Sequence, residues 1–256
     1  MLISHHYRFV LVKPRKMAGT TVELALSPFL MPGDQATPVG PEEAMRVVTD
    51  GVHVGPIRRR VGVLRRTLRL RDHSPLLRAH KVVPQTRGYR VIAICRNPWD
   101  RAVSQFFWSM RRTDIRSAPL ADQKAAFIRY TRRWGPRGWL ELVYGRKRQR
   151  LLDSAHLYTV AGSAQPDYVI RFEALDADLA GLRDWLGLPD APSAQGIRTK
   201  TESRPRSSDW TRFYDARTRD LVARECAREI AMFGYDFEGR QMPRGPFPDQ
   251  VAPGPA

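Results

Sequence analysis

The stretch Tyr7–Ser27, YRFVLVKPRKMAGTTVELALS, decides the fold. It opens with an apolar run from Tyr7 to Val12, rich in β-branched and aromatic residues, which predicts a short buried strand. It closes with TVELAL at 21–26, whose apolar spacing and good helix formers predict a helix. A basic turn containing Gly19 joins the two. Backbone N–H groups at the start of such a helix, together with the helix dipole, favour an anion.

The side chains of this turn strengthen the anion interpretation. Lys16 adds a mobile positive charge, and Thr20 and Thr21 add hydroxyl donors. The turn is not a Walker A loop, because its lysine precedes the glycine instead of following it. Taken alone, the turn is as compatible with an ordinary strand-to-helix connection as with an anion site.

A second strand with a polar end comes later in the chain. The apolar run Tyr89–Cys95 is followed at once by RNPWDRAVS at 96–104, and Pro98 is compatible with a first helical turn. Arg96 at the end of the strand and Ser104 two helical turns later can converge on one anion. The guanidinium fork of arginine suits a phosphate group.

Together, KMAGTT at 16–21 and RNPWDRAVS at 96–104 resemble the nucleotide motifs of sulfotransferases that use 3′-phosphoadenosine 5′-phosphosulfate (PAPS). The segment DYVIRFEAL at 167–175 is similar to a strand and helix entry of that family. Residues 213–237 are similar to the terminal helix of its carbohydrate and membrane-associated branches. The resemblance implies an α/β fold with a mainly parallel sheet flanked by helices, of the P-loop-NTPase-like sulfotransferase kind. It covers roughly residues 7–27, 80–108 and 156–238.

The resemblance also implies roles for the two motifs and a third segment. Residues 16–21 would grip the 5′-phosphosulfate, and Arg96 with Ser104 would hold the 3′-phosphate. A basic loop at 200–206 would close over the 3′-phosphate. The Arg-Lys-Gly triplet of the cytosolic branch is absent, so Lys200, Arg204 and Arg206 are alternative ligands of this phosphate. The implied PAPS-binding residues are Lys16, Met17, Ala18, Gly19, Thr20, Thr21, Arg96, Ser104, Lys200 and Arg204.

The expected reaction needs a group that stabilises charge and a group that takes a proton. Lys16 would stabilise charge on the bridging oxygen, and no metal is expected because lysine and a helix start supply the positive field. His80 is the first candidate for the general base, by resemblance and because imidazole titrates near neutral pH. A structural role for His80 is the competing interpretation. His53 and the carboxylate of Glu23 are the alternatives; His5, His6, His73 and His156 are weaker candidates.

One sulfotransferase domain is expected over residues 1–238, followed by a flexible Pro/Gly-rich tail at 239–256. Residues 28–80 and 105–155 would cap the acceptor side, the second with many arginines and aromatic residues. The expected acceptor is a carbohydrate or glycolipid hydroxyl, with a small alcohol left open. The composition, rich in Arg and Ala, suggests a bacterial source.

Two other classes of protein compete with this interpretation. A P-loop-like kinase or NTPase would need Gly-Lys-Ser/Thr and an acidic magnesium ligand at a strand end, where this chain has Arg96. A non-enzymatic polyanion binder would use the net charge of +17, although we expect no nucleic-acid partner.

The charge is concentrated in the segment Ile57–Arg71, IRRRVGVLRRTLRLR, which is predicted to form an amphipathic helix. Its arginines could be a solvated face, could contact an acidic acceptor, or could make peripheral contact with an anionic membrane. The chain has no apolar run of 18 residues and no signal-peptide pattern, so a soluble cytoplasmic protein is expected.

The remaining predictions concern shorter elements and the cysteines. We expect a strand over His156–Val160, a helix over Asp178–Leu186 that stops at Gly187, and a last helix over Thr218–Phe233. Most of 105–153 is expected to be helical. The only two cysteines of the chain, Cys95 and Cys226, are expected to be buried thiols without a disulfide.

Overall fold

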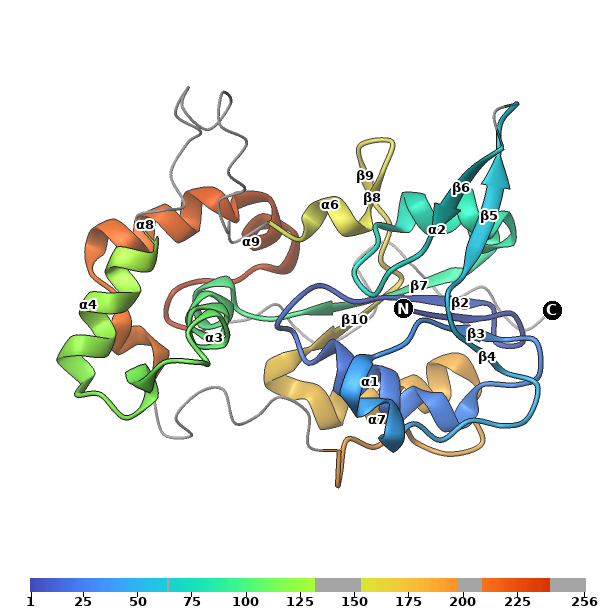
Figure 1. The fold of residues 1–256 in the computed structure, drawn as a ribbon, viewed down its shortest axis with the longest axis horizontal. Helices are drawn as coiled ribbons and strands as arrows, with labels where there is room; N and C mark the ends of the chain where they lie inside the picture. The colour runs from blue at the N-terminus through green and yellow to red at the C-terminus, as the bar shows by residue number, and fades with distance from the viewer. Residues whose placement is uncertain (64, 132–152, 198–208, 240–256) are drawn as a thin grey trace. The chain divides into compact units, whose positions relative to one another are not determined.

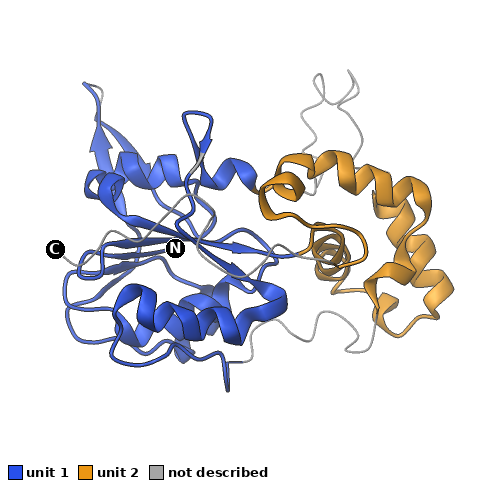
Figure 2. Cartoon of the chain, turned by 180° about the vertical axis from the view of Figure 1, so that it is seen from behind, with its two compact units in different colours: residues 1–96, 155–199, 243–256 blue, residues 97–154, 200–242 orange. Residues whose placement is uncertain are grey.

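The computed structural model of the 256-residue chain describes residues 1–63, 65–131, 153–197 and 209–239. These residues belong to two compact units, shown in different colours in Figure 2. Unit 1 is drawn from residues 1–96 and 155–199, and unit 2 from residues 97–154 and 200–242. Each unit is described by itself. The single domain expected over 1–238 stays a prediction, and the expected tail falls almost wholly outside the described residues.

Unit 1 is built on a six-stranded mixed sheet in the order β10-β7-β2-β1-β3-β4. β2, β7 and β10 run parallel to one another, β3 runs parallel to β4, and β1 is antiparallel to both of its neighbours. The expected α/β class with a mostly parallel sheet flanked by helices is therefore confirmed. The strands are β1 Leu2–Ser4, β2 Phe9–Val12, β3 Gln35–Ala36, β4 His53–Val54, β7 Arg90–Cys95 and β10 Tyr168–Arg171.

Helices lie on both faces of this sheet (Figure 1). α1 (Gly19–Leu26) and α7 (Leu175–Leu186) lie on one face, and α2 (Leu76–Val82) and α6 (Ala155–Tyr158) lie on the other. Because β2 and β7 are buried on both faces, their residues form continuous apolar runs. Alternate strand residues pack with α1 and α7 in one core cluster, which includes Leu11, Ile92, Ile170, Val22 and Leu182.

The segment 57–71 is a β-hairpin, so the predicted helix was wrong. β5 (Arg58–Val61) pairs antiparallel with β6 (Arg66–Arg69). Gly62 lies in the middle of the segment at φ 71°, a left-handed conformation that ends a strand in a turn and does not continue a helix. The register places Val61 and Leu68, which belong to the two paired strands, on one face of the hairpin. Their separation of seven residues is also about two turns of a helix, which is why we assigned them to a helical face.

The described part of unit 2 is helical. Its helices are α3 Pro98–Ser109, α4 Leu120–Thr131, α8 Ala216–Glu225 and α9 Ala227–Phe233, with a 3₁₀ turn at Trp210–Phe213. The predicted last helix is thus two helices, because Cys226 leaves the helical conformation at φ −116°. Three aromatic residues of the segment 105–155 belong to the core of this unit: Phe106, Phe107 and Phe127 are fully buried. The acceptor cap expected over this segment stays a prediction.

Two further predictions can be compared with the structure. Residues 156–160 are not one strand, because α6 continues to Tyr158, whose hydroxyl donates to the Ile94 carbonyl at 2.6 Å. The helix stop at Gly187 is confirmed, since this glycine caps α7 at φ 71°. Cys95 and Cys226 are buried and form no disulfide with each other, as expected. Across the described ranges, no helix combines the length and the apolar composition that a bilayer span requires.

Candidate functional site

The candidate site lies where three parallel strands of unit 1 end. The register pairs Val12 of β2 with Ala93 of β7, and Cys95 of β7 with Arg171 of β10. Since parallel strands end at the same edge, the turn that follows Val12 and the residue that follows Cys95 lie at one edge of the sheet. This edge is the usual ligand position in open α/β sheets.

The turn between β2 and α1 has a backbone that favours an anion. Lys16 and Ala18 adopt left-handed conformations, at φ 63° and φ 57°. Ala18 is the N-cap of α1 and makes no side-chain capping bond. Left-handed residues next to a helix start direct successive N–H groups toward one point, as in backbone nests that bind anions. Two non-glycine residues in this region are costly, so the surrounding structure must hold them there.

Gly19 is required by close packing against Lys13. A Cβ atom at position 19 would lie 2.7 Å from the Cβ of Lys13 and 3.2 Å from its Cδ. No side chain fits there without moving the lysine, so glycine allows the helix start to approach the end of β2. Met17 of the predicted motif is fully buried in the core of unit 1, so only its backbone contributes to the loop.

Arg96 holds the turn directly. Its Nη1 donates to the carbonyl oxygen of Lys16 at 3.0 Å, and its guanidinium lies 3.8 Å from the ring centroid of Phe172. Only 7% of Arg96 is exposed. The two positively charged strand-end segments therefore meet, as the sequence predicts. The bond to Lys16 adds a function that the sequence did not suggest, which is to fix the backbone of the loop.

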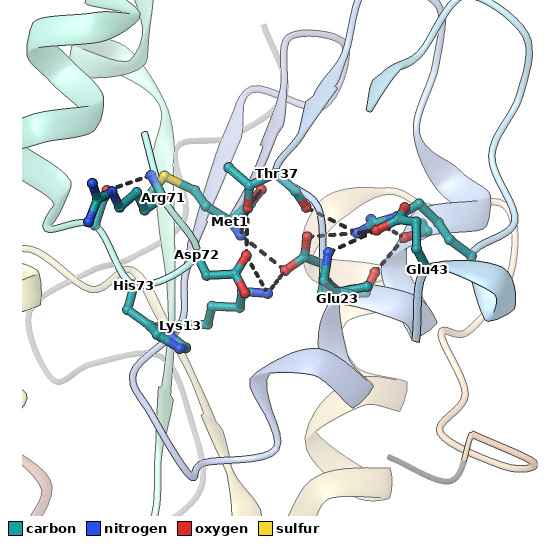
Figure 3. A network of polar contacts seen from close by, with 12 residues as sticks. Met1, Lys13, Glu23, Thr37, Glu43, Arg71, Asp72 and His73 are labelled. Atoms are coloured by element: carbon teal, nitrogen blue, oxygen red, sulfur yellow. Dashed lines mark hydrogen bonds and ion pairs between the residues drawn. The ribbon is translucent and has the colours of Figure 1, made fainter. Parts of the chain in front are cut away.

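Behind the loop lies a buried network of charges (Figure 3). Lys13, which is 1% exposed, forms ion pairs with Glu23 and, at 3.3 Å, with Asp72. Glu23 is fully buried and also accepts from the Met1 amino group at 3.0 Å and from Arg46 Nη2 at 3.1 Å. The network connects the start of the loop to the inward face of α1. It anchors both ends of the turn that contains Lys16.

Glu23 is thereby excluded as a general base. Burial alone would raise the pKa of Glu23, but the Met1 amino group, Lys13 and Arg46 outweigh burial and lower it to about 2. A carboxylate with this pKa has almost no tendency to take a proton at neutral pH. Its full burial also keeps it from an acceptor hydroxyl.

His73, a weaker candidate for the base from the sequence, contacts the start of the loop. Its Nδ1 lies 2.8 Å from the carbonyl oxygen of Lys13 (Figure 3). A carbonyl can only accept, so Nδ1 carries the proton and Nε2 keeps its lone pair. Burial lowers the pKa of His73, so the ring is neutral and basic at neutral pH. The sequence did contain a signal for this position: Asp72, which precedes His73, is the first acidic residue after Asp50.

His80 has the same tautomer as His73 but is bonded to a different segment of the chain. Its Nδ1 lies 3.0 Å from the hydroxyl oxygen of Thr86. Because that hydroxyl donates to the Val83 carbonyl at 2.6 Å, the His80 ring must be the donor, which leaves Nε2 as a proton acceptor. Burial, followed by the charge of Arg87, lowers the pKa of His80. The chemistry of a base is present, and the structure ties this ring to η3 (Pro84–Gly88) and not to the loop.

His53, the other predicted base, lines a pocket of about 480 Å³ in unit 1. Arg58 and Arg59 of β5 and Gln35 of β3 share the lining with Gln85. The Oε1 atom of Gln35 is buried and has no hydrogen-bond partner within the described residues, so a donor is missing there. A ligand hydroxyl would supply such a donor, next to cations that attract an anion.

The remaining predicted residues fall elsewhere. Ser104 belongs to α3 of unit 2 and is 6% exposed, so its predicted meeting with Arg96 at one phosphate stays a prediction. Lys200 and Arg204 lie outside the described residues. Thr20 and Thr21 occupy the first turn of α1, as the sequence predicts. Thr21 is mostly buried, so Thr20 is the more accessible of the two hydroxyls.

None of the protein-family models, curated proteins or solved structures that were compared with this chain matches it significantly. A turn whose backbone favours an anion and a buried arginine share one sheet edge, next to a neutral histidine whose Nε2 keeps its lone pair. This arrangement can bind a phosphate or sulfate ester and can remove a proton from a hydroxyl close to it.

Proposed function

We propose that this protein is a PAPS-dependent sulfotransferase that moves a sulfuryl group to a hydroxyl of a carbohydrate or glycolipid. The observation that carries the proposal is the bond between Arg96 Nη1 and the Lys16 carbonyl, at 3.0 Å. It joins the two segments whose sequences resemble the nucleotide motifs of that family. A P-loop-NTPase-like sulfotransferase fold is part of the same proposal.

The turn Lys16–Thr21 would bind the 5′-phosphosulfate. The backbone N–H groups at the start of α1, the ammonium of Lys16 and the hydroxyl of Thr20 all suit a dianionic ester. Gly19 supports this fit, since the helix start approaches Lys13 so closely that a Cβ would displace it. The 3′-phosphate would bind Arg96 and Ser104, with Lys200 and Arg204 closing over it.

In the proposed reaction the donor supplies an electrophilic sulfur atom. The acceptor oxygen forms a bond to sulfur while the bond from sulfur to the bridging oxygen breaks, and the acceptor proton moves to a base. Lys16 stabilises the charge that grows on the bridging oxygen. A preorganised donor of this kind is typically worth about 100-fold to 1,000-fold in rate. The proposal requires no metal, because the lysine and the helix start provide positive charge.

Two histidines compete for the role of base. His73 is favoured by position, since it is bonded to the first residue of the loop at 2.8 Å. His80 is favoured by the resemblance to the family. Replacing each histidine with alanine distinguishes the two candidates. The variant that lacks the base should lose on the order of 100-fold or more in kcat, while its affinity for 3′-phosphoadenosine 5′-phosphate stays near wild type.

The first test is binding, and it separates the two enzyme classes. A sulfotransferase should bind 3′-phosphoadenosine 5′-phosphate without Mg²⁺, measured by calorimetry, and should prefer it to ATP with Mg²⁺. A kinase or NTPase would show the reverse preference. A polyanion binder without a nucleotide site would bind many polyanions with steep salt dependence and no selectivity for the bisphosphate.

The second test is turnover with ³⁵S-labelled PAPS and a host extract, followed by identification of the labelled product. Lys16→Ala should lose on the order of 100-fold or more in turnover, because the charge on the bridging oxygen is no longer stabilised. Arg183→Ala, which removes an exposed cation of α7 in the same unit, is the matched control. Wild-type turnover in Lys16→Ala would remove this lysine from the mechanism.

A further inference from the structure

The β5–β6 hairpin is anchored at its base and exposed along its length. Ile57 and Leu70, which flank the strands, are buried, and Leu70 N donates to the Ile57 carbonyl at 2.9 Å. Beyond them the hairpin stands out from the rest of unit 1 (Figure 1). The sheet of unit 1 does not include these strands, which pair only with each other in the described chain.

The two faces of the hairpin differ. On one face Val61 and Leu68 are half-buried, and Arg59 Nη1 donates to the Lys81 carbonyl of α2 at 3.3 Å. The other face carries Arg58, Arg60 and Arg69, and all three side chains are exposed. We call these three residues the arginine face. Besides these arginines this second face carries only Thr67, so the two strands place no apolar residue on it.

The charge of the arginine face is not neutralised within the described residues. Arg58 lies directly opposite Arg69 in the register, a like-charge pair that destabilises a hairpin. Neither residue, nor Arg60, forms an ion pair with a carboxylate in the part of the chain that the structure describes. The sequence contains no acidic residue between Asp50 and Asp72. An anionic partner would relieve this repulsion.

The tip of the hairpin indicates which kind of anion. Val63 is fully exposed, at 101% of its reference area, between Gly62 and the exposed residues Arg65 and Arg66. A soluble polyanion has no apolar region in which the Val63 side chain could be buried. A lipid bilayer offers phosphate and carboxylate groups at its surface and an apolar region beneath them, which fits an apolar tip beside arginines.

We propose that the β5–β6 hairpin docks this protein on an anionic membrane surface. Val63 enters the boundary between headgroups and acyl chains, and Arg65 and Arg66 contact lipid phosphates. The arginine face follows behind them within the range of the surface potential. This inference does not depend on the proposed enzyme activity. If that activity is correct, docking brings the pocket lined by Arg58 and Arg59 close to lipid headgroups, which suits a glycolipid acceptor.

The experiment measures binding of the full chain to vesicles by flotation. One set of vesicles is phosphatidylcholine alone, and the other contains phosphatidylserine as well. Wild type should bind only the second set, and more weakly as salt rises. The triple variant Arg58→Gln/Arg60→Gln/Arg69→Gln should bind about a hundredfold more weakly, because each arginine near an anionic surface contributes several-fold to binding. Circular dichroism verifies that the variant is folded.

A control variant and a probe at the tip complete the design. Arg183→Gln/Arg217→Gln/Arg224→Gln removes three exposed cations elsewhere and should bind close to wild type. Val63→Cys can be labelled with an environment-sensitive dye, since Cys95 and Cys226 are buried. The dye should shift to the blue on phosphatidylserine vesicles and not with a heparin hexasaccharide. Unchanged binding by the triple variant, or a dye that responds only to the hexasaccharide, would overturn the proposal.

Discussion

Glu23 in unit 1 and Glu229 in unit 2 are both completely buried, but they have different numbers of cationic partners. Glu23 contacts Lys13, Arg46 and the Met1 amino group. Burial lowers the pKa of that amino group to about 5, so Lys13 and Arg46 are the cationic partners of Glu23 at neutral pH. Within the described residues Glu229 pairs with Arg101 at 2.7 Å and accepts from Ser154 N at 3.1 Å.

The two sites therefore shift the pKa of a glutamate carboxyl group in opposite directions. At Glu23 several cations outweigh burial, and the pKa falls to about 2. At Glu229 burial outweighs the single arginine and raises the pKa. Glu229 Oε1 also has no hydrogen-bond partner among the described residues. Burial favours the neutral form, and nearby cations and hydrogen bonds to the charged form decide whether a buried carboxyl stays charged. Unit 1 uses its charged glutamate to hold the candidate loop.

The largest expected effect is that of Glu23→Ala. Removing this carboxylate leaves Lys13 and Arg46 buried without their shared partner, which should cost about 3–5 kcal/mol of the free energy of unfolding. Denaturant-induced unfolding followed by circular dichroism measures it. A loss below about 1 kcal/mol would mean that both cations find other partners, and the contrast with Glu229 would disappear.

Acid should weaken unit 1 by a similar mechanism. The pKa of Glu23 in the folded protein, about 2, lies below its ordinary value of 4.5. Its contribution is therefore complete above pH 4.5 and is lost as the pH falls toward 2, by about 3 kcal/mol in total. Unfolding free energies measured across this range should fall steeply in wild type. In Glu23→Gln the same curve should be flatter; an equally steep curve would assign the acid sensitivity to other carboxylates.

Glu229→Gln should change stability by no more than about 1 kcal/mol, because the amide can still accept from Ser154 N and Arg101. The sign of its pH dependence is opposite to that of Glu23. Since the pKa of Glu229 is raised in the folded protein, its contribution is complete below 4.5 and is lost as the pH rises through the folded pKa. The variant should lose this dependence in urea titrations at several pH values. A cost as large as that of Glu23→Ala would show that Glu229 is fully charged.

The smallest expected effect is that of Asp72→Asn, which removes the second carboxylate near Lys13. Asp72 is about one-third exposed, and its ion pair at 3.3 Å is screened by solvent, so the variant should lose less than about 1 kcal/mol. The same unfolding assay measures it, with Asp220→Asn, an exposed partner of Arg219, as the control. A loss comparable to Glu23→Ala would make Asp72 an equal partner in the network.

The sheet and its loop could be predicted because local patterns determine them. In the apolar runs of β2 and β7 and in the glycine turn before α1, local propensity, hydrophobic pattern and turn residues all favour the same structure. Such agreement makes a segment predictable from sequence. The segment 57–71 misled us because Val61 and Leu68, seven residues apart, share one face in a helix as well as in this hairpin. Gly62, which adopts a left-handed conformation in the turn, was the sign of a hairpin.

The charge network could not be predicted, because its members are distant in sequence. Glu23, Lys13, Arg46 and Asp72 come together only when β1, α1 and the segments around 46 and 72 have packed. A carboxylate in the first helix looked like a candidate base, and its role as a structural counter-ion depends on the cations that packing brings to it. His73 was ranked low for the same reason, since its bond to Lys13 spans sixty positions of the chain.

The hairpin of unit 1 has a further consequence for the behaviour of the protein at high concentration. A two-stranded ribbon has outer backbone edges, and such edges can recruit strands from other molecules and start aggregation. Arg58 and Arg69 oppose each other on this ribbon, so an approaching copy would add further positive charge at close range. The repulsion that destabilises the hairpin thus also protects it from self-association, and salt should weaken that protection.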